Sequence, residues 1–495
     1  MKFDDFVKSP ISALRAISQN FTYAKYAAFF EIAQALIFLQ SRRIATFYGC
    51  IKFEPDAEIG EMDDMTNNAE NESSRGSRTA GQLLDIGYEE ALRLALSSVQ
   101  PLGEETLAVD RAVGRILSRA VHAKVDSPSL NASLKDGYAV VSADIAEAGH
   151  ENPVSLAVKG YVSAGDVDSA TEVRSGCAVR ILSGAPVPKG ADAVLAEEFV
   201  RVQDDHILAL ADADPGRNIL ERGSDVFRDE ILFSEGERLR PQAAGLVVAG
   251  GVSAVSVYTR PKIGLLATGS EVLLPGAAFE EGKLYASNLA LQHAWFTSGG
   301  FDVVFRLSED SKTGIADAIQ SLRSETDVII TSGGAWKGDR DLVVGVLDAL
   351  GWDMLFHRVR MGPGKAVGMG VFDQKPVFCL PGGPASNEAA FMMIVFPAVL
   401  RMAGCSHAPY LQLHGHLSRS VSGQTDWTQF IQCDMSAGPD GIVLHPMKMK
   451  SRLAAMARTP AVVKIPEGVD TLLQNSLVPF VCLDRERFMM PIDSG

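Results

Sequence analysis

The segment Asp327–Ser386 decides the fold; it reads DVIITSGGAWKGDRD (327–341), VRMGPGKA (359–366) and KPVFCLPGGPAS (375–386). Each apolar run has the composition of a β-strand and ends in a glycine-rich turn, and these turns carry Asp339, Asp341, Lys365 and Ser386. Glycine lets backbone amides approach an anion, and a cation beside paired carboxylates suits a phosphate and a metal ion. Open α/β sheets bind ligands at the carboxyl ends of their strands. We therefore expect an anion-binding centre at such an edge.

Length and composition indicate a soluble protein of several domains. The chain has 495 residues, 46% of them hydrophobic and 22% charged, which is enough for three or four cores. Its net charge of -15 argues against nonspecific binding to nucleic acid or to a membrane, so an anionic ligand needs a local basic patch. The six cysteines are scattered without a CxxC pair, which favours reduced thiols in a cytoplasmic protein.

Residues 1–82 predict an extension and a disordered linker. The apolar stretch 26–39 contains Glu31 and Gln34 and is short for a membrane span of ~20 residues. We expect an extension helix packed on the body or a start codon assigned too early; an amphipathic helix lying on a surface is the alternative. Residues 55–81 are acidic, polar and rich in glycine and serine, a composition typical of disorder.

Strands and helices alternate from Pro261 onward. Strands are expected at 262–267, 302–307, 327–331 and 376–380, and helices at 288–297, 312–323, 342–350 and 386–402. This alternation predicts a mostly parallel, doubly wound sheet. Before it, Gly87–Val99 has the spacing of an amphipathic helix, and short β-type runs follow. After Gly404 the β-type texture returns, so the predicted fold class is α/β multidomain with β-rich domains.

Six motifs link the chain to a known family: NASLKDGYAV (131–140), ILSGAPVPKGADAV (181–194), ATGSE (267–271), SGGAWKGDRD (332–341), PGKAVGMG (363–370) and LPGGPAS (380–386). In this order they resemble the molybdopterin molybdenumtransferases, which include the E domain of gephyrin. The resemblance runs from about Leu83 to the C-terminus. It implies that molybdate is inserted into adenylylated molybdopterin with release of AMP, assisted by Mg²⁺ or another divalent cation.

The resemblance also implies a homodimer with a site shared between subunits. Each subunit would have an elongated N-terminal domain with a helix, a β-rich domain with the DGYA and SGAP loops, a doubly wound molybdopterin-binding-like α/β domain and a C-terminal β domain. Their expected ranges are 83–124 with 226–260, 125–225, 261–403 and 404–495.

Four residues take catalytic roles by this resemblance: Asp136, Asp310, Asp341 and Lys365. Asp136 lies in the KDGYA loop, which faces the partner subunit; a turn aspartate before glycine is the structural alternative. Asp310 follows a predicted strand, where helix capping is the alternative. Lys365 would contact phosphate or molybdate oxygens.

Carboxylates are expected to hold the divalent cation, because it prefers oxygen ligands. Asp339 and Asp341 lie two residues apart, and Glu271 closes the TGSE turn; an acidic surface loop and a capped helix are the alternatives. Glycine in the SGG turn lets the backbone approach a pterin or phosphate. The residues expected to bind molybdopterin are Ser183, Ser332, Gly333, Gly334, Arg358, Ser386 and Ser451.

Four positions depart from the family pattern. Gly362 replaces a lysine, Gly383 an asparagine and Gln432 an arginine, while Trp336 replaces a small residue. Two lost cations weaken an oxyanion site by ~1.5–3 kcal/mol for each charged hydrogen bond. Two alternatives to molybdenum insertion therefore stay open: a divergent paralogue acting on another pterin or metal step, and a non-catalytic molybdopterin-binding scaffold.

Overall fold

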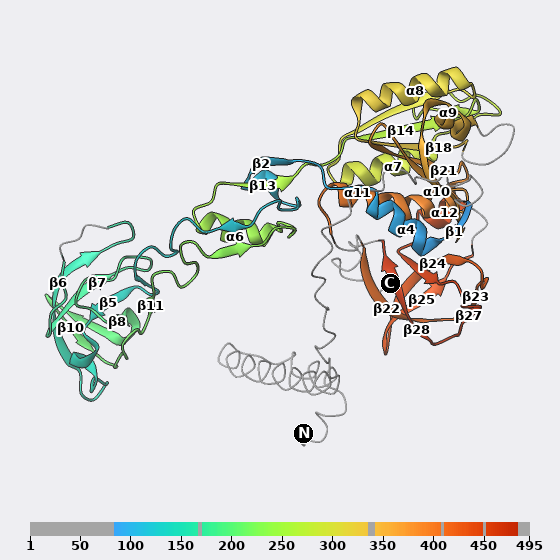
Figure 1. The fold of residues 1–495 in the computed structure, drawn as a ribbon. Coiled ribbons are helices and arrows are strands. Elements are labelled where there is room, and N and C mark those ends of the chain that lie inside the picture. The colour runs from blue at the N-terminus through green and yellow to red at the C-terminus, as the bar shows by residue number, and fades with distance from the viewer. Residues whose placement is uncertain (1–83, 167–170, 335–341, 407–409, 449–451, 484–495) are drawn as a thin grey trace, which may run out of the picture. The chain divides into compact units, whose positions relative to one another are not determined.

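The computed structural model describes residues 84–166, 171–334, 342–406, 410–448 and 452–483, all within the compact unit Arg78–Gly495 (Figure 1). The extension and linker predicted for residues 1–82 lie outside the described residues. None of the helices in the described ranges is long and apolar enough to cross a membrane.

The α/β domain is built on four adjacent parallel strands in the order β17-β14-β18-β21. Their bounds are β14 Ile263–Thr268, β17 Val303–Ser308, β18 Val328–Ser332 and β21 Lys375–Leu380. Every residue of β14 and β18 is buried. Helices cover both faces of the sheet, which is why these strands read as continuous apolar runs rather than as alternating ones.

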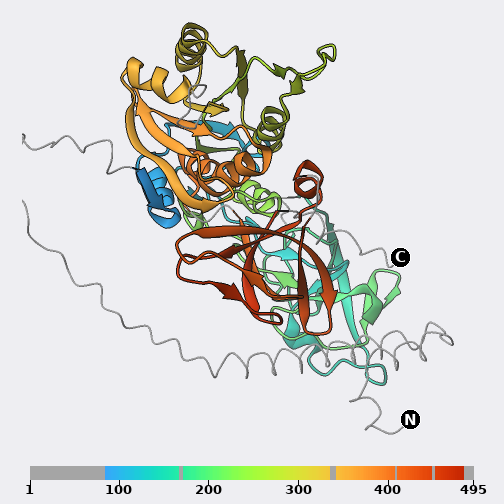
Figure 2. The same ribbon diagram turned by 90° about the vertical axis from the view of Figure 1, so that its right-hand side faces the viewer.

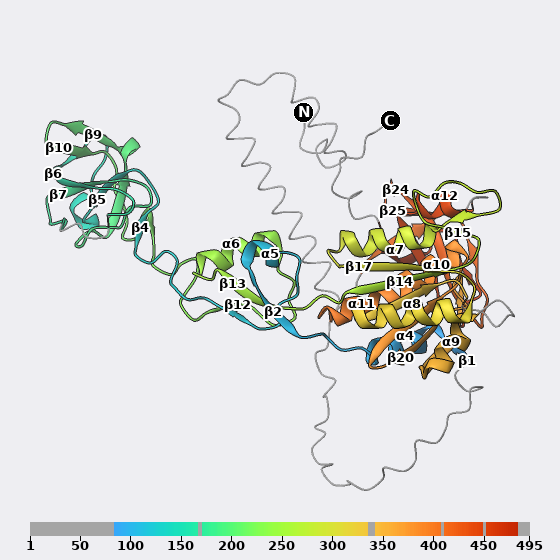
Figure 3. The same cartoon turned by 90° about the horizontal axis from the view of Figure 1, so that it is seen from above.

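The helices divide between the two faces as a doubly wound sheet requires. α8 (Lys312–Glu325) and α9 (Leu342–Leu350) share one core cluster, and α7 (Ser287–Ser298) contributes to the other. Figure 3 shows α7 and α8 on opposite sides of β14 and β17. The expected strands and helices of this domain are therefore present, and the predicted fold class is confirmed.

Two details of this domain differ from the expectation. The sheet is mixed, because β20 (Gly368–Phe372) and β19 (Asp353–Gly362) continue it with antiparallel pairs. The helix expected over 386–402 is interrupted: α10 (Pro384–Ala390) is followed by the π-helical turn η4 (Phe391–Val395) and by α11 (Phe396–Met402). Pro397 supplies no N–H and would crowd the preceding turn of an α-helix, a conflict that a π turn relieves.

The first described strand belongs to the α/β domain rather than to the N-terminal domain in which the expected range 83–124 placed it. β1 (Leu84–Gly87) pairs in parallel with β19, and α4 (Tyr88–Ser97) packs against β19, η4 and α11. Tyr88 lies edge-on to Phe430 with ring centroids 5.0 Å apart. Apolar spacing predicted this helix, but it does not reveal which core the apolar face joins.

The chain between α4 and β14 forms several small sheets. β2 (Glu104–Ala108) pairs with β13 (Ala254–Tyr258), β3 (Val121–His122) with β12 (Ile231–Phe233), and β4 (Ala132–Ser133) with β11 (Ile219–Leu220). Helices α5 (Val109–Ala112) and α6 (Pro241–Ala249) complete the core around β2 and β13.

A six-stranded sheet in the order β8-β5-β7-β6-β10-β9 forms the β-rich domain. Its elements are β5 Gly137–Val140, η2 Ser142–Ile145, β6 Val154–Val162, β7 Cys177–Ile181, β8 Ala193–Ala196, η3 Glu197–Phe199, β9 Val200–Gln203 and β10 His206–Ala209. Gly137 is required in β5, because a Cβ there would lie 2.1 Å from the carbonyl oxygen of Leu195 on β8.

The C-terminal region is a second β-rich layer, whose strands curl into a strongly bent sheet (Figure 2). Its elements are β22 Leu411–Leu417, β23 Val421–Ser422, β24 Thr428–Gly438, β25 Gly441–Pro446, α12 Arg452–Met456, β26 Ala461–Ile465, β27 Thr471–Leu472 and β28 Leu477–Cys482. β24 pairs with the end of β19 through Met361–Thr428 and Gly362–Gln429. Backbone pairing thus joins this layer to the α/β sheet.

Candidate functional site

Most of the predicted site residues that the structure describes in the α/β domain lie at one edge of its sheet. β14, β17, β18 and β21 are parallel, so their carboxyl ends meet there. β19 is antiparallel to β20, which is antiparallel to β21, and so β19 also ends at this edge. The strand ends, turns and helix starts at this edge carry Ser270, Glu271, Asp310, Ser332, Gly333, Gly334, Lys365 and Ser386. We call this region the carboxyl edge.

A cavity of about 480 Å³ at the carboxyl edge brings Glu271 and Asp310 together with Lys283. Asp310 Oδ2 accepts from the Ser270 amide at 3.3 Å, and the Asp310 amide donates to Ser270 Oγ at 3.3 Å. Lys283 Nζ donates to the Ser270 carbonyl at 2.5 Å. Asp310 does not cap α8, because Ser311 does so by accepting from the Gly314 amide. The carboxylate of Asp310 is exposed beside the cavity.

The turn after β18 requires glycine at two successive positions. Gly333 has φ of 101° and Gly334 has φ of 66°, values that disfavour any residue with a Cβ. A Cβ on Gly333 would also lie 2.8 Å from the carbonyl oxygen of Thr268. The Gly333 amide donates to the Leu380 carbonyl at 3.0 Å, which ties this turn to the end of β21. Two successive residues without side chains therefore lie at the carboxyl edge.

Two asparagines that the sequence reasoning missed lock the neighbouring turns. Asn288 Nδ2 donates to Ser332 Oγ at 3.1 Å and to the Gly382 carbonyl at 2.8 Å. Asn387 Nδ2 donates to Ser332 Oγ at 3.0 Å and to the Pro381 carbonyl at 2.8 Å. Ser332, only 7% exposed, therefore has its hydroxyl committed to positioning. The sequence signal that could have identified Asn288 and Asn387 is the presence of a polar residue on the apolar face of α7 and of α10.

The predicted cations occupy different surroundings. Lys365 Nζ lies 4.6 Å from the centre of the Trp427 ring, a cation–π distance that joins the PGK turn to the C-terminal region. Arg358 is partly buried on β19 with φ of 71°. Its neighbour Arg360 donates to Glu467 at 3.2 Å and to the Asp85 carbonyl. Arg360 thus secures β1 and the C-terminal region to β19.

A carboxyl group beside the carboxyl edge has a shifted pKa. Glu388 lies on α10 two residues after Ser386, and burial raises its pKa to about 7 while a hydrogen bond from Gln432 opposes the rise. Gln432 Nε2 donates to Glu388 Oε2 at 3.1 Å. Gln432 stands where the resembled family carries an arginine. An arginine there would face this carboxyl and keep it charged.

Asp136 and Ser183 lie together in the β-rich domain. The Ser183 amide donates to Asp136 Oδ1 at 2.7 Å, and the Glu197 amide donates to the Asp136 carbonyl at 3.0 Å. Both Asp136 and Ser183 are exposed. The structure thus joins the KDGYA loop to the SGAP turn and leaves the second carboxylate oxygen of Asp136 at the surface.

Four positions of interest lie outside the described residues: Asp339, Asp341, Ser451 and Trp336. Within the part of the chain that is described, no three His, Cys, Asp or Glu side chains converge in a metal-binding group. The cavity with Glu271 and Asp310 is bordered by Leu342, the residue that follows segment 335–341.

Comparison with known proteins supplies the family. Residues 86–251 match the MoeA N-terminal region (domain I and II), and residues 264–401 match a probable molybdopterin binding domain. Over 393 residues the chain is 31% identical to the molybdopterin molybdenumtransferase of Bacillus subtilis (strain 168), with 77% of this chain and 90% of the relative covered. The chain belongs to the molybdopterin molybdenumtransferase family.

Other relatives agree with this membership. A molybdopterin molybdenumtransferase of Staphylococcus aureus (strain MSSA476) is 26% identical over 386 residues, covering 77% of this chain and 92% of the relative. The crystal structure of the molybdopterin biosynthesis MoeA protein from Pyrococcus horikosii is similar with a TM-score of 0.70 and 29% identity, covering 81% and 99% of the two chains. The resemblance expected from the six motifs is confirmed.

Two departures from the molybdopterin molybdenumtransferase pattern leave room at the carboxyl edge. A Cβ on Gly383 would meet nothing within 4 Å, and one on Gly362 would meet only the Gln429 side chain at 3.9 Å. Neither glycine has a positive φ. Packing around the Cβ position therefore does not impose glycine at 362 or 383.

Proposed function

We propose that the protein inserts molybdate into adenylylated molybdopterin and releases AMP, as a cytoplasmic step of molybdenum cofactor biosynthesis. One observation carries the proposal: in a member of this family, the SGG and PGG turns, the Ser270–Asp310 pair and the PGK turn leave the same sheet edge. Four separate sequence motifs are thereby brought to one place where an anionic substrate can bind. The buried Cys379 and Cys433 form no disulfide, which supports the cytoplasmic location.

The roles of the residues follow from the charge that the reaction handles. Gly333 and Gly334 let backbone groups approach the phosphate or pterin, and Lys365 supplies positive charge to phosphate or molybdate oxygens. Asp310 and Asp341 would orient or deprotonate the attacking water. Arg358, Ser386, Ser183 and Ser451 would bind molybdopterin. Positioning and electrostatic stabilisation thus account for catalysis without a covalent nucleophile.

A divalent cation, with Mg²⁺ as the first candidate, would be held by Asp339, Asp341 and Glu271. When bound it would neutralise charge on the phosphate oxygens. The oxygen donors suit a hard cation, and Glu271 lines the same cavity as Asp310. Since the described residues alone hold no three-ligand cluster, the set depends on Asp339 and Asp341.

The site is proposed to be completed across a homodimer by Asp136 of the other subunit. Asp136 is held on one side by the Ser183 amide and is exposed on the other, which suits a loop that meets a second chain. Gel filtration with light scattering tests the dimer, and mixing inactive Asp136→Ala with inactive Lys365→Ala chains tests the sharing. Recovery of about a quarter of the activity is expected on mixing equal amounts, because about half of the dimers are hybrids and each hybrid retains one of its two sites.

The reaction itself is tested by incubating the protein with adenylylated molybdopterin, molybdate and Mg²⁺ while AMP and mature cofactor are measured. AMP release that depends on molybdate supports the proposal. Tight substrate binding without turnover favours the scaffold alternative. If turnover is absent but appears in a Gly362→Lys/Gly383→Asn variant, which the free space at both positions permits, the chain is a divergent paralogue.

A further inference from the structure

A second cavity, of about 780 Å³, lies at the opposite end of the α/β sheet. Its lining includes Arg260, just before β14, and Gly299 and Phe301, just before β17. Both strands run from this amino end toward the carboxyl edge, and six strand residues span ~20 Å. The cavity, which we call the arginine cavity, is therefore separate from the candidate functional site.

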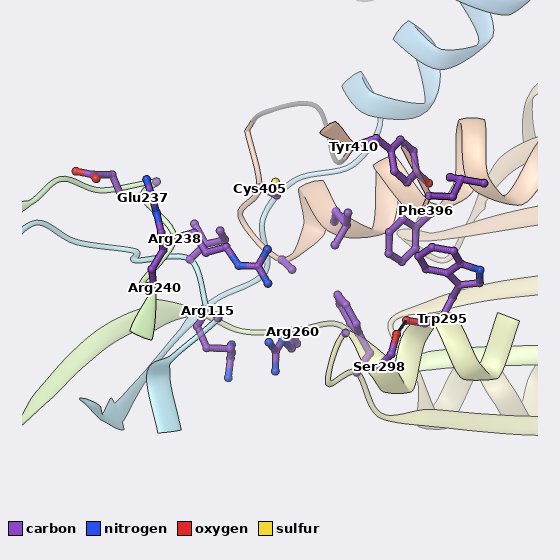
Figure 4. A pocket seen from close by; sticks show the side chains of 18 of the residues that line it. Arg115, Glu237, Arg238, Arg240, Arg260, Trp295, Ser298, Phe396, Cys405 and Tyr410 are labelled. Atoms are coloured by element: carbon purple, nitrogen blue, oxygen red, sulfur yellow. Dashed lines mark hydrogen bonds between the residues drawn. The ribbon is translucent and has the colours of Figure 1, made fainter. Parts of the chain in front are cut away.

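Four arginines from three chain segments face the arginine cavity: Arg115, Arg238, Arg240 and Arg260 (Figure 4). Arg115 is paired with Glu105 at 2.6 Å. For the other three, no carboxylate within the described ranges comes into ion-pair distance. Arg260 donates to the Gly300 carbonyl at 3.1 Å. In a protein with net charge -15, an excess of positive charge around one cavity is a local exception.

The positive charge is concentrated enough to affect the arginines themselves. Burial lowers the pKa of Arg260, and the charges of Arg115 and Arg238 lower it further. Like charges that repel one another are stabilised by an anion placed between them. Arg238 and Arg240 are exposed and free of structural ion pairs in the described part of the chain, so binding an anion would not break an existing contact.

The other side of the arginine cavity is aromatic. Trp295 and Phe396 meet edge to face with centroids 5.7 Å apart, and Phe396 stacks on Tyr410 at 6.2 Å. Trp295 and Tyr410 are partly exposed. Figure 4 shows these rings on one side of the cavity and the arginines on the other. The cavity thus has a face for a planar ring and a face for a negative group.

We propose that the arginine cavity binds a nucleoside phosphate. The phosphate would lie among Arg238, Arg240 and Arg260, because one guanidinium group can donate two parallel hydrogen bonds to phosphate oxygens. The base would contact Trp295 and Tyr410, because aromatic side chains stack on bases. A volume of about 780 Å³ falls in the range of small-molecule sites and greatly exceeds the size of inorganic phosphate.

Photolabelling of the full-length protein with 8-azidoadenosine 5′-monophosphate tests this proposal. We expect labelled peptides containing Trp295 or Tyr410, protected by excess AMP and not by adenosine. The double substitution Arg238→Gln/Arg240→Gln should weaken this labelling at least about tenfold, since each charged hydrogen bond lost costs that much or more. The matched control Arg93→Gln/Arg201→Gln removes the same charge from exposed arginines elsewhere and should leave labelling unchanged.

Lys365→Ala separates this site from the carboxyl edge. It should abolish any label near Ser270 and Asp310 and leave the label at Trp295 or Tyr410 intact. The proposal is overturned by an absence of label in the cavity at millimolar probe. It is equally overturned by labelling that the Arg238/Arg240 variant retains, or by equal protection from adenosine or inorganic phosphate. Because the side chains of Arg238 and Arg240 are exposed, the double variant should keep the wild-type melting temperature.

Discussion

Replacing Glu388 with glutamine is expected to stabilise the protein above neutral pH and to leave it unchanged in acid. Burial raises the pKa of Glu388 from its usual value of 4.5 to about 7. Between these values the folded carboxyl holds a proton that the unfolded chain has released. The free energy of unfolding therefore falls as pH rises through this window. The contribution of Glu388 to this stability is lowest above about pH 7. Glutamine keeps the shape and removes the charge.

The size of this effect follows from the two pKa values. Their difference of about 2.5 corresponds to ~3.4 kcal/mol at most. Glu388 is partly exposed and hydrogen-bonded to Gln432, so we expect ~1–3 kcal/mol for Glu388→Gln at pH 8. For a domain of this size, each kcal/mol of added stability corresponds to a rise in melting temperature of ~2–4 °C. Below about pH 4 the two proteins should melt together.

Melting temperatures measured by fluorescence from about pH 4 to about pH 8 provide the assay. Gln432→Arg is the matched variant, because a cation 3.1 Å from the carboxyl should lower the Glu388 pKa and flatten the pH dependence in the same way. Adding Gln432→Arg to Glu388→Gln should not raise the melting temperature further. A difference between wild type and Glu388→Gln that stays constant over the whole range would refute the reasoning.

Four further outcomes are expected. Lys365→Ala should abolish AMP release while shifting the melting temperature little. Lys365 is only partly buried, and its ring contact with Trp427 is worth ~0.5–1 kcal/mol. Full activity of this variant would show that Lys365 is not a site residue. Asp310→Asn should keep the Ser270 contact but reduce turnover at least about tenfold, as expected for a proton-handling carboxylate, and unchanged kcat would contradict this. Gly333→Ala should destabilise the α/β domain by ~1–3 kcal/mol in denaturant melts, because φ of 101° and the Thr268 carbonyl both oppose a Cβ. Gly137→Ala should unfold the six-stranded sheet selectively, seen as fast amide exchange in β5 and β8 with an intact α/β domain; uniform protection would show that β5 adjusts.

The pattern of buried strands was predictable because it is local. β14 and β18 are buried along their whole length, so their residues are apolar at every position and stand out from the flanking turns. Helix α9 covers Leu342–Leu350, the range that its apolar spacing predicts. The glycines at 333 and 334 likewise indicate a turn, since positive φ excludes most other residues.

The sequence by itself thus determined the four parallel strands of the α/β core, the helices that alternate with them, and the motifs that mark the family. Only the tertiary structure decided which distant groups meet: Ser270 with Asp310 across 40 positions, Asn288 with Gly382 across 94, and α4 with the α/β core. It also decided that Gln432 faces Glu388 and that four arginines line one side of a cavity. The physical reason is that hydrogen bonding and charge act between neighbours in space, and periodicity along a chain records only neighbours in sequence.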